Sequence, residues 1–594
     1  MSNTGQRICG QVSPAILDKV NRLFRNDETG IWVELLQNAR RAGASIVTVE
    51  ITESNKQCEI LVTDNGSGIQ DFQNLLTLGA SDWNPAIVKL EDPAGMGFFA
   101  LCHSEVEIHS GRKRTTLRPE VFLGRTEADV FETEEAIAGT QIRFTRGSSK
   151  TQLVTALERV AEFGPIEVRV DGEIVSRHDF LEGAEHREWI DGVEIGIGSS
   201  FCWNWSHNDD NWNFYGGRLR HPFHCPDGWL TCDERGRWST TPLYARFDVR
   251  DTSMLKLQLP DRRAIVEDES LRSFEQKVLT AVYRFLQTQE RHALPFRNWR
   301  EAKDLGVLLP EAVPLLTTWH AAPRDEFFEP IFESPETVLL HHVADVLLVE
   351  EGIPNPHTLE AALVTGGTLG SALHKEHRAF QGYRWYDRVP RLANTVVRID
   401  GALHDQWVGT GQIRPTRIEI EANVHEPENG DRSVILPALI HVDSESINEP
   451  LFAVVTNSPW DHADREQPFS VADFLMWATF SASDDFGECD SWETQREEYQ
   501  ADIERMVSEY FGGARAALLA VLQRTVPWEA HAYLDQLDIT EVRFRRGDGR
   551  RIWNVEFVDL TSSRRTASFD LRTVADVNTA YLQESDCTLL EHTE

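Results

Sequence analysis

The sequence lacks any run of about 20 apolar residues, which is the length that a helix needs to cross a membrane. The nearest candidate, residues 338–349, is interrupted by His341, His342 and Asp345. The first residues, MSNTGQRICG, also lack the basic and then apolar order of a secretory signal. We therefore expect no membrane span, no secretion and a cytoplasmic protein.

Closely spaced cysteine pairs are also absent. The eight cysteines are scattered over the whole length, which does not indicate a disulfide framework and fits a reducing compartment. One local group remains, and it consists of Cys202, His221, His224, Cys225 and Cys232. Zinc sites usually pair their ligands at spacings of two to four residues, and this group has no second close cysteine pair. We interpret its members as ordinary buried or loop residues, with a metal site as the alternative.

Positive charge is scarce, because 59 Lys and Arg residues stand against 95 Asp and Glu residues and the formal net charge is −36. Binding to a phosphate backbone is driven by Lys and Arg, so nucleic acid repels such a chain unless basic residues gather on one face. Short basic groups occur at 112–114 and 543–551, and a solvated hairpin or strand edge is the simpler interpretation of both. Nucleic acid is therefore a secondary hypothesis.

The remaining composition is that of a well-cored globular protein, with 41% hydrophobic and 26% charged residues. At roughly 150 residues per domain, the length suggests three or four domains. We predict an α+β protein. Its expected parts are an α/β sandwich over 1–164, a second α+β domain over 165–290, a linker or helical region over 291–390 and a mixed α/β region over 391–594.

Apolar periodicity predicts the elements of the first domain. Helical spacing predicts helices over 14–26 and 30–42, and the second ends at Gly43. Alternation predicts strands over 45–52 and 58–63. The same patterns predict a short helix over 98–102, strands over 105–110, 115–122, 140–144 and 166–170, helices over 150–163, 270–289 and 494–524, strands within 390–458 and a hairpin within 538–582.

Three short motifs suggest chemistry, and the first lies in the helix over 30–42. Glu34 and Asn38 are four residues apart, so they share one face of this helix. An Asn oxygen can ligate Mg²⁺, which prefers oxygen donors, and a Glu one turn earlier can orient a water against a phosphate. A solvent-facing pair of the same two residues is the common alternative.

The second motif is the segment 64–68 (DNGSG), which directly follows a predicted strand. The Asp64 carboxylate can accept a hydrogen bond from the exocyclic amine of adenine, and Gly66 and Gly68 let the backbone approach the base closely. The alternative is a plain turn, for which this segment is also well suited.

The third motif contains Gly95 and Gly97, directly before the short helix over 98–102. Glycines at the start of a helix present backbone N–H groups and a positive dipole end to phosphates. A glycine pair alone does not establish such a site, and only the three motifs together indicate one.

In this order and spacing, the motifs resemble those of the Bergerat-fold (GHKL) ATPase superfamily, which includes DNA gyrase B, the ninety-kilodalton heat-shock chaperone, MutL and the sensor histidine kinases. The resemblance covers about residues 14–145. Residues 139–144 (GTQIRF) look like the family's closing Gly-Thr strand, and residues 78–81 (LGAS) look like the segment ahead of its lid. None of the residues before Glu34 is His, so the layout is unlike that of a histidine kinase.

The resemblance implies ATP and Mg²⁺ as ligands and gives each site residue a role. Asn38 is then the Mg²⁺ ligand, and Glu34 is the general base that orients the attacking water. Asp64 reads adenine with the support of Thr140. Close approach to the base is implied for Gly66 and Gly68, and phosphate binding for Gly95 and Gly97. Residues of about 70–96 are the expected lid, which excludes water when it closes.

Arg41 departs from the family pattern, which often has Asp-Ala three residues after the Asn. Arg41 lies seven residues after Glu34 and therefore on the same helical stripe. It can pair with Glu34 or another acid, or reach the nucleotide. A pairing that lowered the basicity of Glu34 would slow hydrolysis.

Gyrase, MutL and the chaperone place an α+β transducer domain after the ATPase module, and residues 165–290 resemble such a domain in position. In those relatives, a basic residue of the second domain reaches the γ-phosphate. Arg262 and Arg263 are the candidates here, and the alternative is a surface loop with an ion pair to Glu267 or Asp268.

Two hypotheses on function follow. The first is an Mg-dependent ATPase of the chaperone or MutL type, in which ATP drives lid closure and homodimerisation so that the protein acts on a partner protein. The second is a nucleotide-gated module that does not hydrolyse ATP and serves as a sensor or scaffold.

Overall fold

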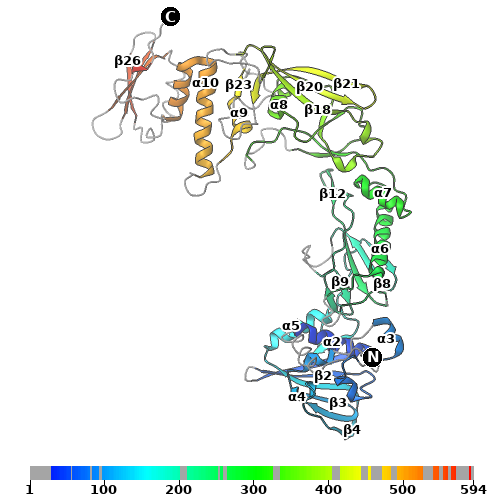
Figure 1. The fold of residues 1–594 in the computed structure, drawn as a ribbon. Helices are drawn as coiled ribbons and strands as arrows, with labels where there is room; N and C mark the ends of the chain where they lie inside the picture. The colour runs from blue at the N-terminus through cyan, green and yellow to red at the C-terminus, as the bar shows by residue number, and fades with distance from the viewer. Residues whose placement is uncertain are drawn as a thin grey trace, which may run out of the picture. The chain divides into compact units, whose positions relative to one another are not determined.

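The computed structural model divides into two compact units, Met1–Val313 and Pro314–Glu594. It describes residues 28–54, 57–79, 83–91, 97–200, 210–251, 254–258, 264–325, 335–404, 415–442, 453–455, 471–482, 491–525, 539–546, 553–559, 564–569 and 588–589. Figure 1 shows the helices and strands of both units along the chain. The predicted helix over 14–26 lies outside the described residues.

The first sheet of unit 1 has six strands in the order β3-β4-β2-β1-β5-β6. They are β1 (Ile46–Ser54), β2 (Gln57–Asp64), β3 (Val106–Leu117), β4 (Val130–Arg146), β5 (Glu167–Val170) and β6 (Glu173–Ile174). Neighbouring strands are antiparallel, except that β5 runs parallel to β1 with Ile46 opposite Glu167. Because β5 and β6 belong to this sheet, the sheet continues past residue 164, where the sequence suggested the end of the first domain.

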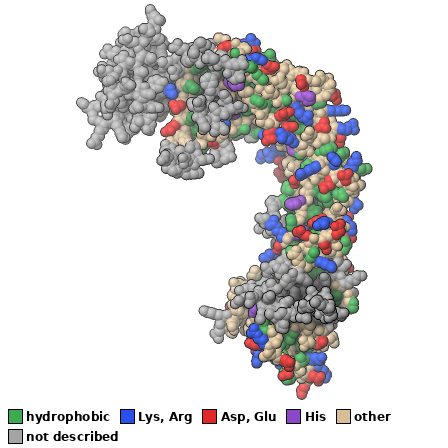
Figure 2. Space-filling model, viewed as in Figure 1, with side chains coloured by type: hydrophobic (Ala, Val, Ile, Leu, Met, Phe, Trp, Pro, Cys, Tyr) green, Lys and Arg blue, Asp and Glu red, His purple; other side chains and the backbone are tan. Residues whose placement is uncertain are grey.

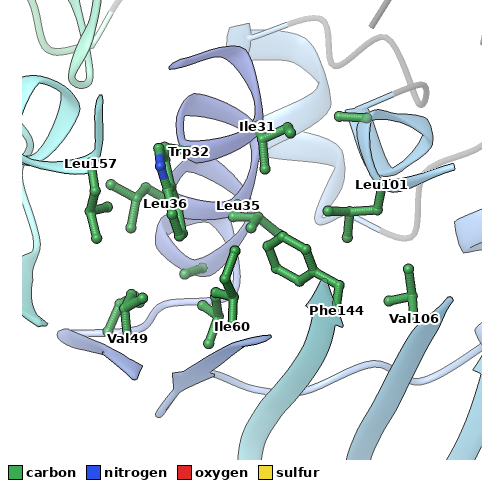
Figure 3. Packing of buried hydrophobic residues seen from close by; sticks show 14 of the residues in the cluster. Ile31, Trp32, Leu35, Leu36, Val49, Ile60, Leu101, Val106, Phe144 and Leu157 are labelled. Carbon is green, nitrogen blue, oxygen red and sulfur yellow. The ribbon is translucent and has the colours of Figure 1, made fainter. Parts of the chain in front are cut away.

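Helices α2 (Glu28–Arg41) and α5 (Lys150–Ala161) contribute their apolar sides to the core over this sheet. The buried apolar residues of α2 recur at helical spacing, and they are Ile31, Trp32, Leu35, Leu36 and Ala39. Figure 3 shows Leu35 beside Phe144 of β4. Burial of each large side chain contributes about 1.5–3 kcal/mol. The apolar side therefore fixes α2, and with it the direction of its polar face.

Short elements lie between β2 and β4, before and after β3. They are the 3₁₀ helix η1 (Phe72–Leu76), α3 (Pro85–Glu91), the 3₁₀ helix η2 (Gly97–Leu101) and α4 (Pro119–Phe122). The predicted helix over 98–102 is thus present as η2. The predicted strand over 115–122 is wrong in its second half, because β3 ends at Leu117 and α4 follows. Pro119 lies in the first turn of α4, where its missing N–H costs no hydrogen bond.

A second sheet in unit 1 has the strand order β10-β9-β13-β8-β7. Its strands are β7 (His186–Ile190), β8 (Val193–Gly198), β9 (Trp212–Phe214), β10 (Gly217–Leu219) and β13 (Tyr244–Val249). Helix α6 (Glu269–Thr288) confirms the helix predicted over 270–289, and its Phe274 packs with Trp212 and Phe247. The hairpin β11 (Trp229–Cys232)–β12 (Trp238–Thr241) and α7 (Phe296–Asp304) complete the described part of this unit.

Unit 2 contains its own mixed sheet, in the order β17-β16-β18-β20-β21, with β19 paired to β18. Its strands are β16 (Val346–Val349), β17 (Ala372–Lys375), β18 (Arg391–Ile399), β19 (Ala402–Leu403), β20 (Ile418–Glu426) and β21 (Gly430–Ala438). Further elements are β14 (Leu315–Thr317), β15 (Thr337–Leu339), β22 (Ile440–Val442), β23 (Ala453–Val455), α8 (Pro356–Val364), α9 (Val471–Thr479), α10 (Trp492–Thr525), η3 (Arg378–Phe380) and η4 (Tyr386–Arg388). The last sheet is β26 (Arg564–Phe569), β25 (Trp553–Asp559), β24 (Ile539–Arg546) and β27 (Thr588–Leu589).

The arrangement is that of an α+β protein, as predicted. Helices pack over sheets that are mostly antiparallel, and the few parallel pairs are β1–β5, β9–β13, β16–β17 and β16–β18 among the described strands. Within the described residues, each helix is too short or too polar to cross a membrane.

Candidate functional site

The polar face of α2 holds the first motif. Glu34 and Asn38 are half-buried on this face, one helical turn apart. The backbone carbonyl oxygen of Asn38 accepts a hydrogen bond from Ala42 N at 2.9 Å, so the helical geometry continues to the end of α2. Gly43 then adopts a φ of 75°, which ends the helix where the sequence predicted.

The second motif is fixed to the C-terminal end of α2. Asp64 is the last residue of β2, and its Oδ1 accepts a hydrogen bond from Gly66 N at 2.8 Å. Ser67 N donates to Ala42 O at 2.8 Å, and a Cβ on Gly66 would lie 2.8 Å from the Ala42 Cβ. The turn therefore needs glycine at 66 to lie this close to the helix.

The Asp64 carboxyl group is partly removed from water. Burial raises its pKa above the ordinary value, although hydrogen bonds from the backbone of Gly66 and Thr140 act in the opposite direction. These two hydrogen bonds stabilise the ionised form and offset part of the effect of burial, and they hold the carboxyl group in a fixed orientation.

Thr140 lies next to Asp64, because it is the residue of β4 that pairs with Asp64 of β2. Its Oγ1 is 3.3 Å from Ser110 Oγ of β3, and Ser110 Oγ donates to Gly139 O at 2.9 Å. Ile69 N donates to the same Ser110 hydroxyl at 2.8 Å. A buried hydroxyl pair thus connects three strands and the end of the DNGSG segment.

Ser110 was not predicted as a site residue. The only signal in the sequence is its position at the end of a predicted strand that directly precedes Gly111. Gly68 packs against it, because a Cβ on Gly68 would lie 2.7 Å from Ser110 Oγ, whereas Gly139 packs directly on the Asp64 backbone. Both glycines have positive φ, at 75° and 72°.

The third motif is described only in part. Gly97 is the first residue of η2 and lies against Glu34, because a Cβ at this position would collide with the Glu34 carboxylate. Gly95 lies outside the described residues. The structure therefore brings Gly97 against Glu34 in the middle of α2 and Gly66 against Ala42 at its C-terminal end.

Arg41 pairs with an acid other than Glu34. Its Nε donates to Glu91 Oε2 of α3 at 2.9 Å, and its Nη1 donates to the Asn38 Oδ1 at 3.3 Å. Its Nη2 donates to Gln37 Oε1 at 3.1 Å. Glu91 was not foreseen as a partner, because it is 50 residues away in the sequence.

The residues of the possible metal group do not converge in the part of the chain that the structure describes. No group of three His, Cys, Asp or Glu is placed there to hold a metal ion. Burial raises the pKa of Cys225 to about 12, whereas Cys232 is exposed on β11. Cys202, Arg262 and Arg263 lie outside the described residues.

The charged side chains of unit 1 are mixed in sign. The short basic group at 112–114 lies on β3, where Arg114 Nη2 is 3.0 Å from Glu107 Oε2. Arg118 and Arg143 have similar exposed partners in Glu105 and Glu59. Figure 2 shows Lys, Arg, Asp and Glu interspersed among the described residues of the face it draws. These pairs agree with a solvated strand edge at 112–114.

Comparison with known proteins adds little to this geometry. No protein-family model matches the chain, and no curated protein matches it significantly. A solved structure described as "Crystal Structure of N terminal domain of a DNA repair protein" is similar over 46% of this chain and 98% of that chain, with 15% sequence identity and a TM-score of 0.30. This likeness is too low for an argument about fold or function.

Proposed function

We propose that the chain is a Bergerat-type ATPase that binds ATP and Mg²⁺ on the polar face of α2. The observation that carries the proposal is the meeting of separate motifs on this one helix. The Asp64–Gly66 turn packs against Ala42 at its end, and Gly97 packs against Glu34 near its middle. Motifs that met by chance in the sequence would have no reason to converge on one helical face.

The side chains suit the parts of a nucleotide. Asp64 offers a carboxyl oxygen as acceptor for the adenine amine, and Gly66 and Gly68 add no side chain beside it. Asn38 supplies an oxygen donor of the kind that Mg²⁺ prefers. The metal would neutralise phosphate charge when it is bound, and Glu34 would orient a water one helical turn away.

Asp64→Asn tests nucleotide binding. The amide would present an N–H₂ group to the adenine amine or lose its hydrogen bond from Gly66, so we expect affinity for ATP to fall at least about tenfold, the equivalent of one good hydrogen bond to a charged group. Isothermal titration calorimetry measures this change. Asp129→Asn, at an exposed position of the same unit, is the matched control. Undiminished ATP affinity in Asp64→Asn would contradict the assignment of Asp64 to the nucleotide site.

Glu34→Gln tests hydrolysis. Loss of a general base typically lowers the rate about 10²–10⁴-fold, so steady-state phosphate release should fall by this factor while ATP affinity is retained. Equal turnover in both proteins would show that Glu34 is not the base.

A specific contact favours the second hypothesis, a nucleotide-gated sensor or scaffold without hydrolysis. The guanidinium of Arg41 donates to the Asn38 oxygen that would ligate Mg²⁺. If wild type binds ATP but releases no phosphate above the Glu34→Gln background, the sensor is the correct function. In either case we propose a cytoplasmic protein that dimerises on ATP binding and acts on a partner protein, and sedimentation with and without nucleotide measures the dimer.

A further inference from the structure

Two adjacent arginines of α2 share one carboxylate oxygen. Arg40 Nη2 lies 2.5 Å from Glu91 Oε2, and Arg41 Nε lies 2.9 Å from the same atom. Glu91 is the last residue of α3, which lies within the segment expected to form the lid. The cluster therefore ties this segment directly to the helix that carries the candidate site.

The cluster is withdrawn from solvent. The Arg41 and Glu91 side chains are only 3% and 7% exposed. Burial alone would raise the pKa of Glu91, but the hydrogen bonds and charges of Arg40 and Arg41 outweigh burial and lower it. Glu91 is thus held as a carboxylate, and one negative charge faces two positive charges.

The same contact reaches the predicted metal ligand. Arg41 donates to Asn38 Oδ1 at 3.3 Å while it holds Glu91 and Gln37. A guanidinium in this position competes with a cation for the Asn38 oxygen. The planar fork of Arg binds carboxylates and phosphates with the same geometry, so a phosphate can replace Glu91 as its partner.

The cluster also reaches the second sheet of unit 1. The Arg40 Cζ lies 3.8 Å from the centre of the Tyr215 ring, at the turn between β9 and β10. Tyr215 has a φ of 53°, and Gly216 N donates to Asn213 Oδ1 at 2.9 Å, which holds this turn in shape. Gln37 Nε2 donates to Phe214 O beside it at 3.3 Å. A displacement of the Arg40 side chain would therefore remove a contact of the Tyr215 ring.

We propose that Glu91 is an autoinhibitory latch that occupies the phosphate-binding arginines of the free protein. The latch keeps Arg41 on Asn38 and Arg40 under Tyr215. The phosphates of Mg-ATP displace the Glu91 carboxylate from Arg40 and Arg41, which frees Asn38 for the metal, releases α3 and shifts the Tyr215 turn. This inference rests on the proposed nucleotide site and adds Arg40 and Arg41 to it as phosphate-binding residues.

Glu91→Asp tests the latch, because it keeps the negative charge but shortens the side chain by one methylene. An aspartate cannot span the same distance to both arginines, so nucleotide should meet less competition. We expect the affinity for Mg-ATP, measured by calorimetry, to rise about tenfold over wild type. The matched control is Glu107→Asp, which shortens an exposed partner of Arg114 and should leave the affinity unchanged.

The outcomes separate the latch from the nucleotide site itself. Wild type that binds Mg-ATP together with Glu91→Asp that binds equally or more weakly overturns the latch and leaves the proposed function standing. Absence of binding in both proteins overturns the proposed function, and the latch fails with it. Tighter binding in both Glu91→Asp and Glu107→Asp also overturns the latch.

Hydrogen exchange of the wild-type protein tests the latch without any variant. Saturating Mg-ATP should change exchange of the amides of α3 (Pro85–Glu91) and at Trp212–Leu219, because both segments contact the arginines of α2 that the phosphates would take over. Unchanged exchange in α3 at saturating nucleotide would contradict the displacement of Glu91.

Discussion

Asp248 illustrates how a single buried carboxyl group supports the turn beside the candidate site. Its Oδ1 accepts a hydrogen bond from Asn213 Nδ2 at 2.8 Å, and Asn213 in turn holds Gly216 N. Burial raises the pKa of Asp248 to about 6, even though Arg250 lies 2.6 Å from its Oδ2. At neutral pH the folded protein therefore contains a carboxylate that would be more stable in water.

Asp248→Asn should alter how stability depends on pH. A folded pKa above the unfolded value of 3.8 means that the folded state binds the proton more tightly, so this group's contribution to stability is lost as pH rises from about 4 through 6. Urea unfolding of both proteins at several pH values measures the effect. The difference in unfolding free energy, variant minus wild type, should rise by on the order of 3 kcal/mol between pH 4 and pH 7. A difference independent of pH would contradict the assignment.

Single residues were predictable from the sequence where a motif fixed their position. Asp64 and Thr140 are register partners in the sheet, and their closeness follows from two strands that the sequence itself indicates. Glu91 and Ser110 carry no such pattern. Their partners lie about 30–50 residues away, and contacts of that range depend on packing rather than on local periodicity.

At the scale of elements, helices and strands with a clear apolar period were predictable. Helix α2 begins within two residues of its predicted start and ends before Gly43, and α6 matches the predicted helix within one residue at each end. Short elements without a period were not. The sequence predicted separate strands over 105–110 and 115–122, but β3 runs without a break from Val106 to Leu117 and Pro119 starts α4.

Elements also differ in whether their partners could be known. The alternation of β5 is visible in the sequence, and the choice of β1 as its neighbour is not. A parallel pair needs a long crossover, which here includes most of the first domain. The strand itself was therefore predicted correctly. Its expected place at the start of the second domain was not, because it pairs with β1 in the first sheet.

The whole molecule consists of two units that separate at Val313 and Pro314. The hydrophobic clusters around Trp32 and Trp212 lie in unit 1, and the clusters around Trp477 and Leu347 lie in unit 2. Each unit thus has its own core, and the candidate site lies wholly in the first.

A fragment of residues 1–313 should fold alone and keep the nucleotide affinity of the full chain. The reason is that, among the described residues, the hydrophobic clusters around Trp32 and Trp212 and the polar face of α2 are formed by residues of unit 1. Far-ultraviolet circular dichroism and calorimetry with Mg-ATP measure folding and affinity. A folded fragment with an affinity more than about tenfold below that of the full chain would show that unit 2 contributes to the site.

The parallel pairing of β5 with β1 has a consequence for how the protein is made. During synthesis, β1 can pair with β2 at once, but its other edge stays open until residues 167–170 have left the ribosome. An open strand edge with buried positions such as Val47 and Val49 is a template for pairing with other chains. The nascent chain is therefore exposed to misassembly between the appearance of β1 and that of β5, and a chaperone that shields this edge would act during that interval.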